Sequence, residues 1–189
     1  MDRIQYRELV MAQLGDAYRL GAEALISDPD PEVFDCSELV EWSYGRAGVH
    51  IRDGAWAQYE DTAPVTGAVQ IGDLVFLRNN PDRPHDIGHV GIIVSVNAAT
   101  GEAFIVEAKG REYGVVLSTL SGWRRRTSFA GVRRHAGFAA KVPYPAVLRW
   151  WKVLIHTSDD ELGEYKRLAA SNDDFIAPTL TTKDAWKEW

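Results

Sequence analysis

Two different spacings of apolar residues divide the chain into an early helical part and a later part rich in strands. Between residues 4 and 20, apolar side chains recur every three or four positions, which predicts an amphipathic helix. A second helix is predicted to begin at Cys36, because Asp35 is a favoured N-cap residue and Glu38 follows three positions later, as in a capping box. Gly48 is a typical end for this helix.

From residue 73 onward the helical spacing gives way to short apolar runs that indicate β-strands. Segments 73–77, 89–94 and 103–106 are typical of strands, and 127–134 is a candidate for one more. Residues 97–101 form a natural turn, so the second and third strands are expected to make an antiparallel hairpin. Helices followed by strands predict an α+β fold in which N-terminal helices pack on an antiparallel sheet.

The pattern changes again after Pro143-Tyr144-Pro145. We therefore expect one domain over residues 1–142 and a helical C-terminal extension over residues 143–189, with a capped helix start at Ser158. This extension holds four of the seven tryptophans, Trp150, Trp151, Trp186 and Trp189. Their expected use is to pack the extension onto the core.

Composition excludes several classes of protein. A hydrophobic content of 46% in 189 residues is that of an ordinary globular chain, and a net charge of −6 argues against a nucleic-acid partner. No apolar run is long enough to span a membrane, and the N-terminus lacks the basic start and apolar core of a secretory signal. A single cysteine leaves no internal disulfide.

That cysteine, Cys36, lies in a setting that favours nucleophilic chemistry. A thiol attacks as the thiolate, which a helix N-terminus and a nearby imidazolium both favour, and Cys36 is expected at the first position of its helix. His89 opens a strand and is flanked by glycines that let another element come close. In a hairpin that turns near residue 98, the residue facing His89 is Glu107, give or take one register step. Its carboxylate can orient the imidazole.

Three segments in this order resemble the motifs of the NlpC-type cell-wall cysteine peptidases: Phe34-Asp35-Cys36-Ser37, Gly72-Asp73-Leu74-Val75-Phe76 and Gly88-His89-Val90-Gly91. The resemblance covers Tyr6 to Arg134. It is supported by Ala17-Tyr18-Arg19-Leu20-Gly21, by Arg52 and Gln58, and by Gly131-Val132-Arg133-Arg134. Each motif alone is weak, but their order and spacing together are specific.

The resemblance implies a papain-like core, no cofactor, and cleavage of amide bonds in peptidoglycan stem peptides, often between D-glutamate and diaminopimelate. It also implies that Tyr18 and Ser37 border the oxyanion and substrate-binding region, with the backbone N–H of Cys36 as an oxyanion donor. Two positions depart from the family pattern. Glu38 replaces a usual glycine, and Glu107 stands where the third polar residue is most often histidine.

Other readings of the same residues remain open. The triad would equally serve a muramoyl-alanine amidase or another acyl transfer, and the two departures leave room for a non-enzymatic wall-binding domain. A compact catalytic domain without a leader would suit a phage lysin, or a secreted protein whose signal has been removed, and either would be compatible with further wall-binding modules. No metal is expected, because Cys36, His85, His89 and His135 lack the paired spacing of zinc ligands.

Overall fold

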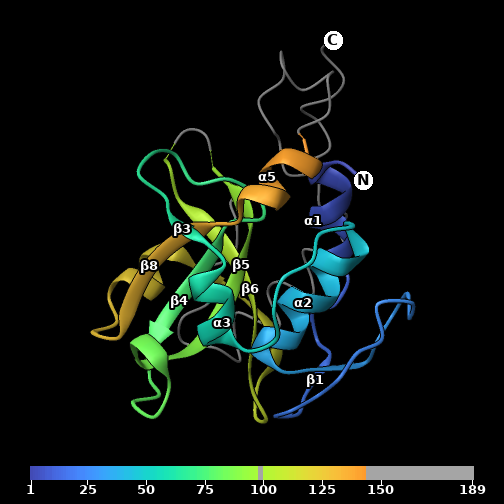
Figure 1. Ribbon diagram of the computed structural model, residues 1–189, viewed down its shortest axis with the longest axis horizontal. Helices are drawn as coiled ribbons and strands as arrows, with labels where there is room; N and C mark the ends of the chain where they lie inside the picture. The colour runs from blue at the N-terminus through green and yellow to red at the C-terminus, as the bar shows by residue number, and fades with distance from the viewer. Residues whose placement is uncertain (98–99, 144–189) are drawn as a thin grey trace.

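The computed structural model describes residues 1–97 and 100–143 and has a six-stranded sheet at its centre (Figure 1). The strand order is β3-β8-β4-β5-β6-β7, and every neighbouring pair is antiparallel. In that order the strands are Ala63–Pro64, Phe129–Arg134, Leu74–Arg78, Ile87–Val96, Ala103–Gly110 and Gly114–Thr119. The predicted α+β class is confirmed. The predicted C-terminal extension lies, apart from Pro143, outside the described residues.

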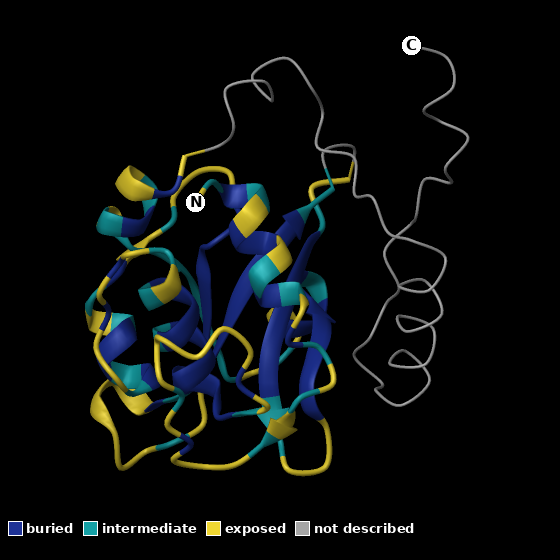
Figure 2. Ribbon diagram, turned by 90° about the vertical axis from the view of Figure 1, so that its right-hand side faces the viewer, coloured by how far each residue is buried: buried dark blue, intermediate teal, exposed yellow. Residues whose placement is uncertain are grey.

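Helices α1 (Arg3–Met11), α2 (Cys36–Arg46) and α3 (Ala55–Glu60) contact strand β5. The sheet has a hydrophobic core on each face, and successive residues of β4 point into different cores, as the period of a strand requires. Leu74 and Phe76 belong to the larger cluster, together with residues of α1 and α2. Val75 and Leu77 join a smaller cluster with Trp123. That tryptophan belongs to α4 (Leu120–Arg124), and Figure 2 shows the buried strands enclosed by these helices and by exposed loops.

The short helix α5 (Ala136–Lys141) closes one end of the larger core. Its Phe138 stacks on Tyr44 of α2 with ring centroids 4.5 Å apart and meets Tyr6 of α1 edge-on at 4.6 Å. Tyr44 in turn donates a hydrogen bond to the carbonyl of Gly72, just before β4. The N-terminal helices are thereby fastened to the sheet, which fixes the position of the α2 N-terminus.

The first predicted helix is wrong in its second half. Helix α1 ends at Met11, and Ala17–Tyr18 forms strand β1, which pairs in parallel with β2 (Val33–Phe34). Gly15 takes a positive φ of 98° and donates its N–H to Val115 of β7. Pairing with distant strands therefore overrides the local helical spacing.

Within the described residues, no helix combines the length and the apolar character needed to cross a membrane.

Candidate active site

Cys36 is the first residue of α2, as the sequence predicted. The Asp35 backbone is extended, and its side-chain Oδ1 accepts hydrogen bonds from the Glu38 N–H and the Ser37 hydroxyl, both at 2.9 Å. The other oxygen of Asp35 accepts from the Gly21 N–H at 2.9 Å. Cys36 is 9% exposed, so it is a nearly buried thiol beside free N–H groups and the positive end of the helix dipole.

The expected capping box is only half formed. The Glu38 carboxylate does not return to the helix N-terminus but accepts the N–H of Ala24 at 2.9 Å, which ties the preceding loop to α2. Burial, together with the charges of Glu41, Asp35 and Asp53, raises the pKa of Glu38 to about 7, although the hydrogen bond from Ala24 opposes this shift.

His89 lies on β5, 8% exposed, and its two ring nitrogens have different partners. Nε2 is 2.6 Å from Oε2 of Glu107. The side chain of Cys36 also hydrogen-bonds to His89, which leaves Nδ1 as the nitrogen for the thiol. Burial lowers the pKa of His89, but the charges of Cys36 and Glu107 and their hydrogen bonds outweigh burial and raise it to about 10. The arrangement thus favours the imidazolium form of His89 beside the Cys36 side chain.

Glu107 lies on β6 and is completely buried. Besides the contact with His89, its Oε1 accepts hydrogen bonds from the Ser118 hydroxyl at 2.5 Å and from the Trp123 indole N–H at 3.1 Å. Burial raises the pKa of Glu107, but the hydrogen bond and charge of His89 and the hydrogen bond from Ser118 more than compensate, and the pKa is lowered. The carboxylate is therefore held in its ionised form.

The hairpin register places Glu107 directly opposite Gly91, two positions along β5 from His89, because Ile92 pairs with Val106. Val96 pairs with Ala103 at the end of the hairpin, and a bulge between Ile93 and Ser95 then shifts the pairing by one residue, so that the register beyond the bulge differs by two from the simple count around residue 98. Glu107 therefore reaches His89 along a diagonal across one face of the sheet. The glycine opposite it carries no side chain that would block this contact.

Tyr18 and Ser37, the other two predicted site residues, have different surroundings near Cys36. Pairing of β1 with β2 sets Tyr18 next to Phe34, and partial burial followed by the charges of Cys36 and Asp35 raises the pKa of the Tyr18 phenol. The Ser37 hydroxyl is engaged with Asp35, and its carbonyl accepts from the buried Gln58 amide at 2.9 Å. Tyr18 is therefore close enough to Cys36 for its charge to raise the phenol pKa, whereas the buried Ser37 is engaged with Asp35 and Gln58.

Two of the four residues considered for a zinc site, His85 and His135, have other partners. His135 caps α5 by accepting the Phe138 N–H, and His85 packs on Tyr59 and contacts Glu60. A different group in the described part of the chain brings carboxylate oxygens within 4.8 Å of one another and is close enough to share a cation: Glu38, Glu41 and Asp53. It lines a hollow of about 490 Å³ beside the loop 21–27.

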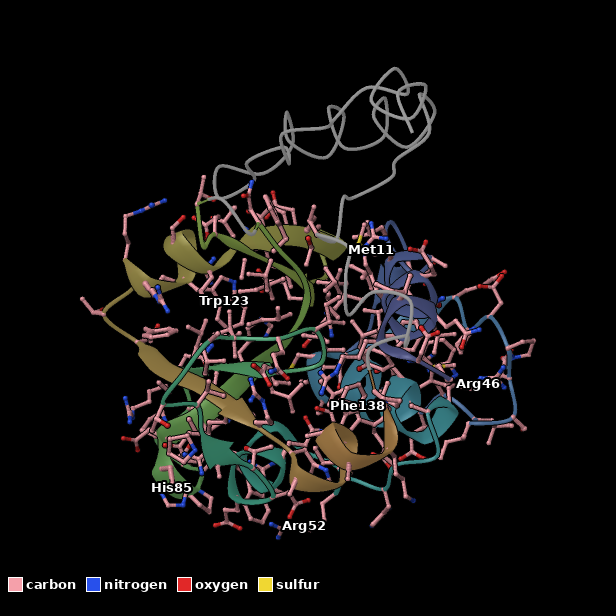
Figure 3. The ribbon with its side chains drawn as sticks, turned by 90° about the horizontal axis from the view of Figure 1, so that it is seen from above. Met11, Arg46, Arg52, His85, Trp123 and Phe138 are labelled. Carbon is pink, nitrogen blue, oxygen red and sulfur yellow. The ribbon has the colours of Figure 1, made fainter. Side chains whose placement is uncertain are left out.

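Ser118 and Trp123 were not recognised from the sequence. Neither belongs to a motif, and both reach Glu107 only through the pairing of β6 with β7 and the turn into α4. Figure 3 shows Trp123 and Phe138 well apart, in line with their membership of different core clusters. Cys36 belongs to the cluster of Phe138 and Trp123 to the other, so His89, which contacts both Cys36 and Trp123, lies where the two cores meet.

Comparison with known proteins finds a family of the same architecture. Residues 15–134 match the NlpC/P60 family. The chain is 31% identical over 111 residues to a probable endopeptidase p60 of Listeria monocytogenes, covering 58% of this chain and 20% of that protein. It is 31% identical over 120 residues to the peptidoglycan DL-endopeptidase CwlO of Bacillus licheniformis, covering 62% of this chain and 24% of that protein.

A solved structure, NlpC1 from Trichomonas vaginalis, superposes with a TM-score of 0.55 at 25% identity, covering 70% of this chain and 44% of that one. The chain thus spans less than half the length of each of these three relatives. The family match takes in β1 to β8 and includes the α2 N-terminus, the β5–β6 hairpin and the residues that meet there. Because this match covers more than half of its length, the chain belongs to the NlpC/P60 family.

Proposed function

We propose that the protein is a cysteine endopeptidase of peptidoglycan that acts on the bacterial cell wall. The observation that carries this proposal is the hydrogen-bonded series from Cys36 through His89 to Glu107, built into an NlpC/P60 fold. A thiol at a helix N-terminus, a histidine that takes its proton and a carboxylate that fixes the histidine are the groups that acyl transfer requires. The endopeptidase names of two relatives support wall peptides as the substrate class.

The reaction begins with the Cys36 thiolate, whose proton resides on Nδ1 of His89. Sulfur attacks the carbonyl carbon of the scissile amide, and the developing oxyanion is stabilised by the backbone N–H of Cys36, with Tyr18 at its border. His89 donates its proton to the leaving amine as the C–N bond breaks, which leaves a thioester. Water then attacks the thioester while His89 accepts a proton, and the free carboxylate product and the thiol are released.

Glu107 stays ionised throughout this cycle. Its hydrogen bond from Nε2 selects the tautomer in which Nδ1 can accept the thiol proton, and its charge stabilises the imidazolium. The glutamate in place of the family's usual histidine is therefore compatible with chemistry, and the intact series argues against a wall-binding domain that has lost its activity.

We propose the bond between D-glutamate and diaminopimelate as the site of cleavage. The DL-endopeptidase name of the Bacillus licheniformis relative supports a bond between residues of opposite chirality. The test is digestion of purified muropeptides, with mass spectrometry of the products from the wild type and from Cys36→Ala. Fragments with a new diaminopimelate amino terminus, made by the wild type only, would support the proposal.

Fragments with a new L-alanine amino terminus would instead assign a muramoyl-alanine amidase. Products made equally by Cys36→Ala would exclude Cys36 as the nucleophile.

A further inference from the structure

One side chain contacts both partners of the proposed base. Trp123 is completely buried, and its ring stacks on the imidazole of His89 with centroids 5.4 Å apart and an interplanar angle of 24°. Its indole N–H donates to Oε1 of Glu107 at 3.1 Å. The same residue therefore sets the plane of the histidine ring and one oxygen of the carboxylate.

The two carboxylate oxygens of Glu107 have different partners, and the contact with Trp123 helps to orient the carboxylate. Oε2 faces His89, whereas Oε1 is held by Ser118 and Trp123. Without these donors, Oε1 would be a buried, charged oxygen lacking hydrogen bonds, and the carboxylate would be free to rotate away from the imidazole. The donors on Oε1 therefore fix the direction in which Oε2 points.

The surrounding chain is shaped to admit the indole. A Cβ on Gly91 would lie 3.2 Å from Cζ2 of Trp123 and 2.6 Å from Cγ2 of Ile105, so a larger residue would press on both side chains. Thr119 caps α4 by accepting the Gly122 N–H, which fixes the turn that carries Trp123. These contacts leave the indole little freedom to move.

The charges around this group are arranged to keep Glu107 ionised. His89 approaches Glu107 from β5. The charge of Cys36, on α2, also acts on the imidazole. The Arg126 guanidinium follows α4, lies 5.4 Å from the Trp123 ring centroid, and contributes to lowering the pKa of Glu107.

We propose that Trp123 is a positioning residue of the active site, which together with Ser118 holds Glu107 and the His89 ring so that Nδ1 faces Cys36. This inference rests on the proposed function, because it assumes that His89 serves Cys36 in acyl transfer. Trp123 contacts His89 and Glu107, and it acts on the reaction only through these two residues. Its loss disturbs the imidazolium and leaves the nucleophile in place.

The test uses Trp123→Phe with Trp42→Phe as its matched control. Trp42 is equally buried and also donates its indole N–H, to the carbonyl of Asp28 at 3.0 Å, but it does not contact Glu107. The readout is the rate of Cys36 alkylation by iodoacetamide as a function of pH, which needs no substrate and reports on the chain's only cysteine.

Trp123→Phe is expected to lower the alkylation rate at pH 6 by about tenfold, the loss of one hydrogen bond to a charged group, and to move the profile to higher pH. Trp42→Phe is expected to leave the profile unchanged. A Trp123→Phe profile that coincides with that of the wild type would overturn the inference, and so would equal shifts in the two variants.

Ser118 gives a second, smaller perturbation in case Trp123→Phe does not fold. Ser118→Ala is expected to shift the profile in the same direction, Ser118→Thr to restore it by keeping the hydroxyl, and Ser43→Ala, another buried hydroxyl, to leave it unchanged. Equal profiles for Ser118→Ala and Ser118→Thr would contradict the inference. A wild-type Cys36 that reacts no faster than a free thiol at pH 6 would instead overturn the proposed function itself.

Discussion

Glu107→Gln tests the proposed triad with a change of charge at nearly constant size. The indole N–H of Trp123 can only donate, so the amide oxygen of the glutamine must take the place of Oε1. The amide NH₂ then faces Nε2 of His89, which has to accept a hydrogen bond instead of donating one. The proton moves to Nδ1, and the imidazole can no longer take a proton from Cys36.

General base catalysis is worth about 10²- to 10⁴-fold in rate, and this substitution is expected to remove most of it. That range corresponds to about 3 to 5 kcal/mol in the activation barrier. The assay is kcat/KM on a soluble muropeptide, with Glu102→Gln as the matched control, because Glu102 precedes the same strand and contacts Ser121 and Ala103 but not His89. A Glu107→Gln enzyme that keeps wild-type kcat/KM would refute the orienting role.

The same substitution should change how stability depends on pH. His89 has its pKa raised from 6.5 to about 10, so its ion pair contributes fully below about pH 6.5 and is lost as the pH rises toward 10. The wild type should therefore lose stability to urea between pH 7 and pH 10, and Glu107→Gln should lose less over that range. Parallel curves for the two proteins would contradict the assigned ion pair.

Three further substitutions test the frame around the site. Asp73→Asn should lower the free energy of unfolding by about 2 kcal/mol or more, because Asp73 is fully buried and accepts two hydrogen bonds from Arg134; urea denaturation at wild-type stability would contradict this. Gly72→Ala should cost about 3 kcal/mol or more by the same measurement, since φ is +87° and a Cβ would lie 2.0 Å from Phe138; a neutral result would show that the ring moves aside. Glu38→Gln should flatten a fall in melting temperature between about pH 4.5 and pH 7, because the folded protein keeps a proton on Glu38 that the unfolded chain releases; an equal fall in both proteins would exclude this carboxyl.

The sequence located the residues at element ends better than it located the contacts between elements. Cys36 after Asp35 and His89 in a β-branched run were recognisable because capping and strand alternation are local properties. Glu107 was found by counting around a hairpin, and it does contact His89. The pairing of Val96 with Ala103, however, centres the hairpin later than residue 98, so the contact is diagonal where a directly facing pair was expected.

The remainder depended on long-range pairing. The helical spacing of residues 12–20 gave way to strand β1 because Gly15 and Asp16 hydrogen-bond to β7. Strand β7 and helix α4 were not predicted. Because Ser118 lies on β7 and Trp123 on α4, these two partners of Glu107 were not predicted either. Such contacts join residues 11 and 16 positions apart through a register that no local pattern encodes.

The basic residues near the end of the domain show the same limit. Arg133 stacks on Tyr59, with its guanidinium carbon 3.9 Å from the ring centroid, and hydrogen-bonds to Thr62, and Arg134 pairs with the buried Asp73. These arginines fasten β8 to its neighbours. Charged residues are mostly exposed in proteins, but here the fold uses two arginines for packing.

In the proposed function, Cys36 cleaves wall peptides with the help of His89. Its most direct test is the release of soluble peptides from purified peptidoglycan of several wall chemistries, compared between the wild type, Cys36→Ala and the control Ser43→Ala. Release by the wild type and by Ser43→Ala is expected from at least one wall type, and none by Cys36→Ala. Release by Cys36→Ala at the wild-type rate, or no release by any of the three from any wall, would contradict it.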